Sequence, residues 1–251
     1  MSITKIIFSP AGTTGRVADV LANALDDAVN TIDLCDRNAE YAAAEIGDLA
    51  VIAMPSFGGR VPALAAERFR QIKADHVPAV VVAVYGNRAY DDVLVETADL
   101  AKEAGFEVVA GVAAVAQHSM VPEYAAGRPN ADDAATLRVF ASQIATKLAS
   151  GEKKEPELPG NRPYKELKQF VTYPMANDNC IQCGACAIAC PTGAIDMEDA
   201  HKMDTSKCVC CMRCISVCPM EARDYAPEQR AGITERLREV CSVYKDYELY
   251  I

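Results

Sequence analysis

The chain has 251 residues, of which 51% are hydrophobic, and it carries a formal net charge of −10. This acidic excess argues against nucleic acid as a partner, because phosphates require faces rich in Lys and Arg. The longest apolar run, Val108 to Ala116, includes Gly111 and is far shorter than a membrane span. Met1 to Ser9 is too short for a signal peptide, so we expect a cytoplasmic protein.

Residues 1–149 alternate short apolar runs with stretches of helical spacing, which is typical of a parallel α/β sheet. The expected strands are Ile3 to Phe8, Asn30 to Leu34, Leu49 to Met54, Ala79 to Tyr85 and Phe106 to Val115. The expected helices are Thr14 to Ala28, Val61 to Ala74, Asp91 to Glu103 and Asp132 to Leu148. This alternation predicts a doubly wound, flavodoxin-like sheet of order 2-1-3-4-5.

The composition changes at residues 150–173, where Pro156, Pro159 and Pro163 predict a semi-extended linker. Residues 174–225 are then expected to form a small α+β domain in which metal clusters replace a hydrophobic core. Residues 226–251 follow as an amphipathic helix and tail. We expect the helix to pack back on one of the domains through its apolar side, which carries Ile233, Leu237, Val240, Cys241 and Tyr244.

Nine of the eleven cysteines lie between Cys180 and Cys218, in two runs that read C-x2-C-x2-C-x3-C-P. In this spacing three thiolates wrap one face of a cubane cluster, and the fourth, displaced by Pro, reaches the neighbouring cluster. The expected ligands of one [4Fe–4S] cluster are therefore Cys180, Cys183, Cys186 and Cys218. Those of the other are Cys208, Cys211, Cys214 and Cys190.

Other readings of the cysteines fit less well. A structural zinc site would use two C-x2-C pairs without a third cysteine in register or a trailing Cys-Pro. A disulfide framework suits a secreted chain. We expect Cys210 to be a bystander beside the clusters rather than a ligand, and Cys35 and Cys241 to be buried small hydrophobes.

Three loops are expected at the carboxyl edge of the sheet, where such folds bind ligands. The first holds Ser9, Gly12, Thr13 and Thr14 directly before a helix. Its hydroxyls and backbone N–H groups could hold a phosphate, although a plain β–α turn fits the loop about as well. The other two loops hold Ser56, Phe57 and Gly58, and Gly86, Asn87 and Tyr90. A planar ring between Phe57 and Tyr90 would fill the gap between them.

Across nearly its whole length the chain resembles the flavodoxin–ferredoxin fusion proteins of anaerobes. The resemblance rests on F-S-P-A-G-T-T, P-S-F-G-G-R-V-P, Y-G-N-R-A-Y-D-D and both cysteine runs. It implies that Ser9, Thr13 and Thr14 contact an FMN phosphate. It also implies that the isoalloxazine lies along Phe57, Gly58, Gly86, Asn87 and Tyr90. Ala11 stands where such loops usually carry Thr, which removes one hydroxyl donor. The alternative is a flavodoxin-like scaffold that has lost its cofactor.

Three further side chains could serve this site. His118 could give a proton to reduced flavin or substrate, but we favour a loop histidine that is hydrogen-bonded to backbone. Arg60 and Arg88 could neutralise a flavin anion or bind a substrate carboxylate. Both arginines could equally be solvated loop charges.

The preferred function is electron transfer, in which two clusters relay single electrons to or from FMN and so couple one-electron to two-electron chemistry. The alternative is an FMN-dependent reductase of a small organic substrate, fed by its own ferredoxin domain. A redox or iron sensor is a weaker third. The acidic surface favours redox partner proteins with basic docking patches. We expect a long linker to keep the two domains of one chain apart, which slightly favours a head-to-tail homodimer.

Overall fold

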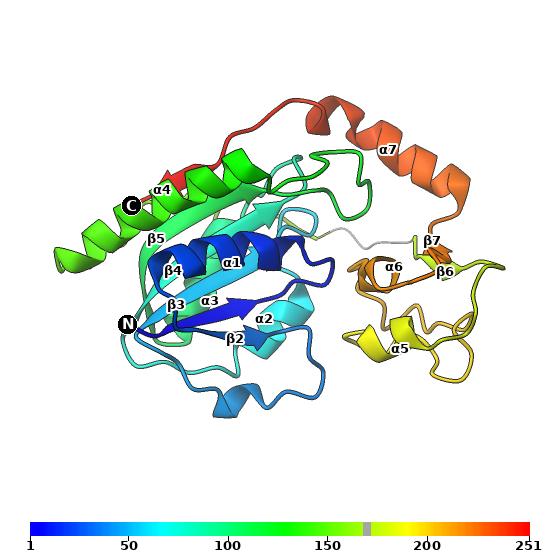
Figure 1. Ribbon diagram of the computed structural model, residues 1–251, viewed down its shortest axis with the longest axis horizontal. Helices are drawn as coiled ribbons and strands as arrows, with labels where there is room; N and C mark the ends of the chain where they lie inside the picture. Colours follow the sequence, from blue (N-terminus) through cyan, green and yellow to red (C-terminus); the bar gives the residue numbers. More distant parts are fainter. Residues whose placement is uncertain (168–171) are drawn as a thin grey trace.

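The computed structural model describes residues 1–167 and 172–251. A sheet of order β2-β1-β3-β4-β5-β8 forms its centre (Figure 1). The first five strands are parallel: β1 (Ile3–Ile7), β2 (Val29–Asp33), β3 (Leu49–Pro55), β4 (Val77–Tyr85) and β5 (Phe106–Val115). The predicted order 2-1-3-4-5 is confirmed.

Helices cover both faces of this sheet, which explains why its middle strands are apolar without alternation. Helices α1 (Thr13–Leu25) and α4 (Ala131–Ala149) pack on one face, and α2 (Ala63–Phe69) and α3 (Val93–Glu103) on the other. A short 3₁₀ turn, Tyr41–Ala43, follows β2. Helix α2 is shorter than the predicted Val61 to Ala74, because its regular hydrogen bonding ends at Phe69. In the described ranges, 1–167 and 172–251, no helix is long and apolar enough to cross a membrane.

A strand that the sequence analysis missed closes the edge of the sheet. Residues Glu248–Tyr250 form β8, which pairs antiparallel with β5 through Gly111 and Tyr250. The predicted amphipathic helix within residues 226–251 is α7, which spans Pro227–Cys241, so Tyr244 lies beyond its end. Three residues of β8 are too few to show a period of two, so the sequence carried little signal for this strand.

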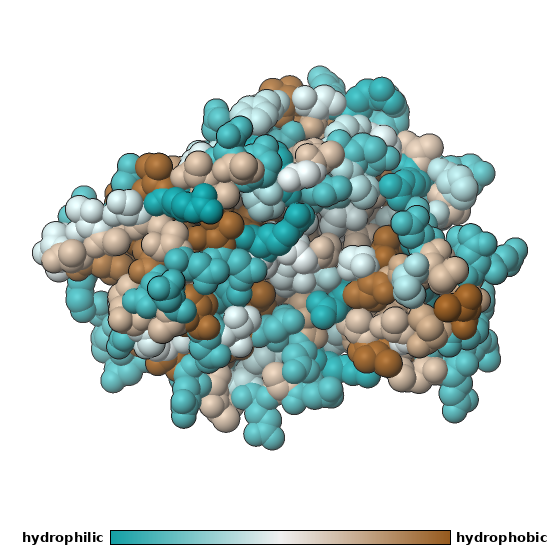
Figure 2. Space-filling view, in the orientation of Figure 1, coloured by the Kyte–Doolittle hydropathy of each residue, from teal (hydrophilic) through white to brown (hydrophobic). Residues whose placement is uncertain are grey.

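The cysteine domain lies beside the sheet and contains two short helices and a two-stranded sheet (Figure 1). Its elements are β6 (Met175–Ala176), α5 (Ala185–Ala189), α6 (Arg213–Ser216) and β7 (Arg223–Asp224). The predicted small α+β domain is confirmed. Apolar side chains gather on the visible surface of this lobe (Figure 2). The exposed apolar residues of the domain include Ile181, Ile188, Met197 and Met220, all more than 40% exposed.

The segment predicted to be a linker lies along the α/β domain as far as the described residues extend. Arg162 makes a two-pronged ion pair with Asp99 on α3 at 2.7 Å, and the buried carboxylate of Asp92 accepts hydrogen bonds from the backbone of Asn161 and Lys165. The hydrogen bonds from Arg162 and Tyr164 lower the pKa of Asp99 to about 2. Residues 168–171 of the predicted linker lie outside the described residues.

The two domains of one chain are in contact, so the expectation that they stand apart is wrong. Arg68 donates to the carbonyl oxygen of Pro191 at 2.6 Å, and Arg37 donates to that of Cys190 at 3.5 Å. The Ser216 hydroxyl also reaches the carbonyl oxygen of Pro10 at 3.4 Å. The acidic net charge did not reveal this docking, because the contacts join arginines to backbone carbonyl groups rather than to carboxylates.

Candidate functional site

The structure sorts the eight predicted cluster cysteines into two separate cavities. One cavity is lined by Cys180, Cys183, Cys186 and Cys218. The other is lined by Cys190, Cys208, Cys211 and Cys214. Among the described residues, no three His, Cys, Asp or Glu side chains converge as the ligands of a single metal ion do. Each cavity thus contains the four cysteines that the spacing assigns to one cluster, and Cys210 also lines the second cavity.

The two cysteine runs have the same backbone conformation, which the internal repeat requires. Gln182 and Cys210 occupy equivalent positions and have φ values of 56° and 50°, while Gly184 and Met212 have 73° and 64°. These left-handed residues turn the loop tightly around each cavity. The N–H of Ala194 donates to Cys190 Sγ at 3.3 Å, and that of Ala222 donates to Cys218 Sγ at 3.2 Å. Such N–H···S bonds raise the potential of an iron–sulfur cluster.

Two arginines that the sequence analysis missed line these cavities. Arg213 lines the cavity of Cys190, Cys208, Cys211 and Cys214, and Arg223 lines the other. The Nε atoms of both are buried and have no hydrogen-bond partner among the described residues. A buried cationic donor without an acceptor is costly, whereas an anionic cluster beside it would supply one. The residues present therefore fit two clusters.

The predicted phosphate loop, residues 9–14, joins β1 to α1 with a conformation that only glycine adopts easily. Gly12 has a φ of 86°, and the Gly15 N–H donates to Ser9 Oγ at 2.7 Å. A Cβ on Gly15 would lie 3.2 Å from that oxygen, so a larger residue would crowd the Ser9 side chain. Ser9 and Thr14 are buried, and Thr13 is half-buried. The loop presents hydroxyl groups and free N–H groups at the start of a 13-residue helix, as an anion site requires.

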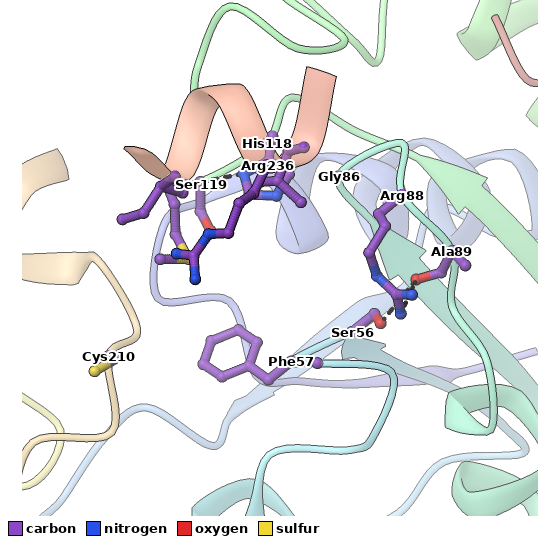
Figure 3. A pocket seen from close by; sticks show the side chains of 13 residues that line it. Ser56, Phe57, Gly86, Arg88, Ala89, His118, Ser119, Cys210 and Arg236 are labelled. Atoms are coloured by element: carbon purple, nitrogen blue, oxygen red, sulfur yellow. Dashed lines mark hydrogen bonds between the residues drawn. The ribbon is translucent and has the colours of Figure 1, made fainter. Parts of the chain in front are cut away.

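A cavity of about 310 Å³ opens at the carboxyl ends of β3, β4 and β5. Ser56, Phe57 and Gly58 line it from one loop, Gly86, Arg88 and Ala89 from the next, and His118, Ser119 and Met120 from a third (Figure 3). Its remaining wall is Cys210 of the cysteine domain together with Ile233, Arg236 and Leu237 of α7. The two domains and α7 thus enclose the cavity together. Ser9, Gly12, Thr13 and Thr14 lie outside its wall.

Two predicted flavin contacts are engaged elsewhere in this structure. The Asn87 side chain donates to the carbonyl oxygens of Cys241 and Val243, at 2.6 and 2.9 Å. The Tyr90 hydroxyl lies 2.9 Å from that of Tyr250, and its ring packs against Tyr85. Neither residue lines the cavity. The structure therefore brings Phe57, but not Tyr90, to the cavity wall.

His118 is held by backbone, as we expected, but it also lines the cavity. Its Nδ1 accepts hydrogen bonds from the N–H groups of Met120 and Val121, both at 3.2 Å. Burial lowers its pKa to about 4. The imidazole is therefore neutral at pH 7 and carries its proton on Nε2, since Nδ1 is the acceptor. A Cβ on Gly86 would lie 2.5 Å from the ring, so the adjacent loop needs glycine there.

The remaining arginines near the site differ in whether they line the cavity. Arg60 makes a two-pronged ion pair with Glu96 at 2.8 Å and lies over the Tyr164 ring, away from the cavity. Arg88 lines the cavity while paired with Asp91. Arg236 is exposed and has no hydrogen bond or ion pair to any described residue. No sequence motif pointed to Arg236, because its helix was assigned only to packing. Cys35 and Cys241 are buried, as expected.

Comparison with known proteins found a family for the cysteine-rich part of the chain. Residues 179–222 match the 4Fe-4S dicluster domain family. The chain therefore joins a flavodoxin-like fold to a 4Fe-4S dicluster domain. No curated protein matches the chain.

Several solved structures are similar to part of this chain. A flavodoxin from Streptococcus pneumoniae TIGR4 is 20% identical, with a TM-score of 0.42, and covers 58% of this chain and 99% of its own. Flavodoxin 2 from Bacillus cereus is 17% identical, with a TM-score of 0.43, over 59% of this chain and 99% of its own. A rubredoxin oxygen:oxidoreductase from Desulfovibrio gigas is 16% identical, with a TM-score of 0.46, over 59% of this chain and 36% of its own.

Proposed function

We propose that this protein is an electron carrier in which two [4Fe–4S] clusters exchange electrons with FMN bound at the carboxyl edge of the sheet. The observation that carries this proposal is the position of the cavity between the domains, since its wall includes both the β3 and β4 loops and the cysteine domain. Clusters supply single electrons and flavin accepts one or two, so the pairing couples the two kinds of chemistry.

The chain's own residues would hold the cofactors as follows. The eight cysteines provide the thiolates, and Arg213 and Arg223 balance their charge. Ser9, Gly12, Thr13 and Thr14 hold the phosphate, and Phe57 offers a ring face to the isoalloxazine. His118 Nε2–H faces the same cavity as a neutral donor. We expect electrons to enter from a cytoplasmic partner with a basic docking patch, because the chain is acidic.

Reduction of FMN by way of the clusters tests this function. A variant with Cys183→Ala and Cys211→Ala removes one ligand from each cluster, and Cys241→Ala is the matched control, since that cysteine lines neither cluster cavity. A reduced one-electron donor protein should reduce bound FMN rapidly in wild type and control. It should do so far more slowly in the double variant. Equal rates in all three proteins would show that the clusters are not relays.

A reductase of a small anionic substrate is the second candidate, because of the polar side chains around the cavity. Arg88, Arg236 and the neutral His118 line it, and no carboxylate does so among the described residues. A small carboxylate that bound there would perturb the flavin absorption spectrum, and Arg236→Met would weaken that effect. An unperturbed spectrum with a range of carboxylates would argue for the carrier.

A further inference from the structure

Cys210 lies in the walls of two different cavities. It lines the cavity of Cys190, Cys208, Cys211 and Cys214, and it also lines the cavity between the domains (Figure 3). It is the one described residue that these two walls share. The cavity of Cys180, Cys183, Cys186 and Cys218 shares no described residue with the interdomain cavity. One cluster site is thus adjacent to the proposed flavin site, and the other is remote.

The internal repeat shows that Cys210 is not needed to shape its own loop. Its equivalent in the first run is Gln182, which has the same left-handed backbone and is exposed. The Gln182 side chain accepts a hydrogen bond from Ala200 N at 2.8 Å, inside its own domain. Glutamine and cysteine therefore both adopt the left-handed backbone that this turn requires. What differs is the environment, because of these two positions only Cys210 lines the interdomain cavity.

Cys210 is held firmly at this boundary. Its Sγ donates to the carbonyl oxygen of Thr172 at 3.5 Å, and the residue is 5% exposed. It packs in an apolar cluster with Val121 of the α/β domain, Met212 and Ile233 of α7. The Cys210 side chain is therefore packed among apolar residues where the walls of the two cavities meet. Cys211, a predicted cluster ligand, is bonded to Cys210 through one peptide unit, so a covalent path runs from the cluster sulfur to this wall.

We propose that Cys210 is the contact through which the cluster of Cys190, Cys208, Cys211 and Cys214 exchanges electrons with a flavin in the interdomain cavity of the same chain. This inference rests on the proposed function. Each transfer through Cys210 oxidises the cluster by one electron. Two transfers, with two protons from water, reduce the flavin by two electrons. The cluster regains its electrons from a one-electron donor protein by way of the remote cluster.

Thiol labelling tests the position of Cys210 without relying on activity. In anaerobic, cluster-loaded protein freed of FMN, iodoacetamide should modify Cys210, and added FMN should abolish this modification, as mapped by mass spectrometry. Cys35 and Cys241 serve as internal controls, because both are buried outside the cavity. No labelling without FMN, or labelling unchanged when FMN is bound, would overturn the inference. Failure of FMN to bind at all would instead overturn the proposed function, and this inference with it.

Replacement of the side chain tests its role in transfer. Cys210→Gly suits the left-handed backbone and leaves the loop relaxed, and Gln182→Gly is the matched control at the equivalent position. With iron and FMN contents equal to wild type, Cys210→Gly should slow flavin reduction by the clusters about tenfold, which is a barrier change of about 1.4 kcal/mol. Gln182→Gly should leave the rate unchanged. Equal rates in both variants would show that Cys210 is not the contact.

Discussion

The side-chain amide of Asn87 donates a 2.6 Å hydrogen bond to the carbonyl oxygen of Cys241, which lies 154 residues further along the chain. This bond joins the loop after β4 to the end of α7. Lys245 donates to the carbonyl oxygens of Asn87 and Arg88 from the same segment. β8 then pairs with β5. Before the cysteine domain, residues 161–165 lie against α3. After it, the end of α7 and β8 contact the α/β domain again. The cysteine domain is therefore attached to the α/β domain at both of its ends.

Removal of the Asn87 side-chain amide should weaken the attachment of α7 to the α/β domain. Asn87→Ala deletes two hydrogen bonds to backbone carbonyls, and we expect a local loss of about 1–3 kcal/mol. Amide exchange in α7 should become faster, while exchange in β3 and β4 should not change. Asn38→Ala, at an exposed loop position of the same domain, is the control. Unchanged exchange in α7 would show that the bond does not hold the helix.

The iron content should depend on the eight predicted ligands alone. Protein purified without oxygen should carry about eight irons and eight sulfides. Cys210→Ser should leave that count unchanged, because Cys210 occupies the position that Gln182 holds in the first run. Cys211→Ser should lose about half of it. If Cys210→Ser lost four irons, Cys210 would be a ligand in place of Cys208 or Cys211.

Stability should fall in acid because of His118. Its pKa is about 4 in the folded chain, below the value of about 6.5 expected when unfolded. The unfolded chain therefore binds the proton first, and the folded state loses up to roughly 3 kcal/mol as the pH falls from 6.5 to 4. His118→Asn keeps an acceptor for the N–H groups of Met120 and Val121 but does not titrate. Urea unfolding at several pH values should show the stability difference between the two proteins shifting in favour of the variant as pH falls. A constant difference would contradict the assignment of a neutral, half-buried imidazole.

The phosphate loop should distinguish FMN from riboflavin. We expect one FMN per chain, and Thr14→Val should weaken its binding by about 1–3 kcal/mol, because a charged acceptor is left one donor short. Riboflavin lacks the phosphate and should bind far more weakly than FMN, and the same substitution should hardly affect it. Titrations followed by flavin fluorescence would measure both. Equal affinities of the wild-type protein for FMN and riboflavin would show that the loop does not bind the FMN phosphate.

The sequence predicted what local patterns encode and missed what depends on the docking of the domains. The sheet order followed from apolar runs such as Ala79 to Tyr85, and the cysteine grouping from spacing alone. The positions of Asn87 and Tyr90 did not follow, because their partners, Cys241 and Tyr250, lie more than 150 residues away. Arg236 carried no motif, and its exposure to the cavity arises only when α7 lies across it. Cys210 was predicted to be a non-ligand, but no sequence pattern indicated that it also lines the interdomain cavity.

We propose that electrons pass from the clusters to the flavin of the same chain. The predicted long linker instead favoured transfer between the two chains of a head-to-tail dimer. The direct measurement is the rate at which clusters reduce FMN as protein concentration changes, after rapid mixing with a one-electron reductant held in excess. Because Cys210 joins the two sites in one chain, the rate constant should be independent of protein concentration over a wide range of dilution. Mixing a chain without clusters (Cys183→Ala with Cys211→Ala) and a chain without FMN (Ser9→Ala with Thr14→Val) should not restore reduction. A rate proportional to concentration, or full rescue in the mixture, would contradict the account.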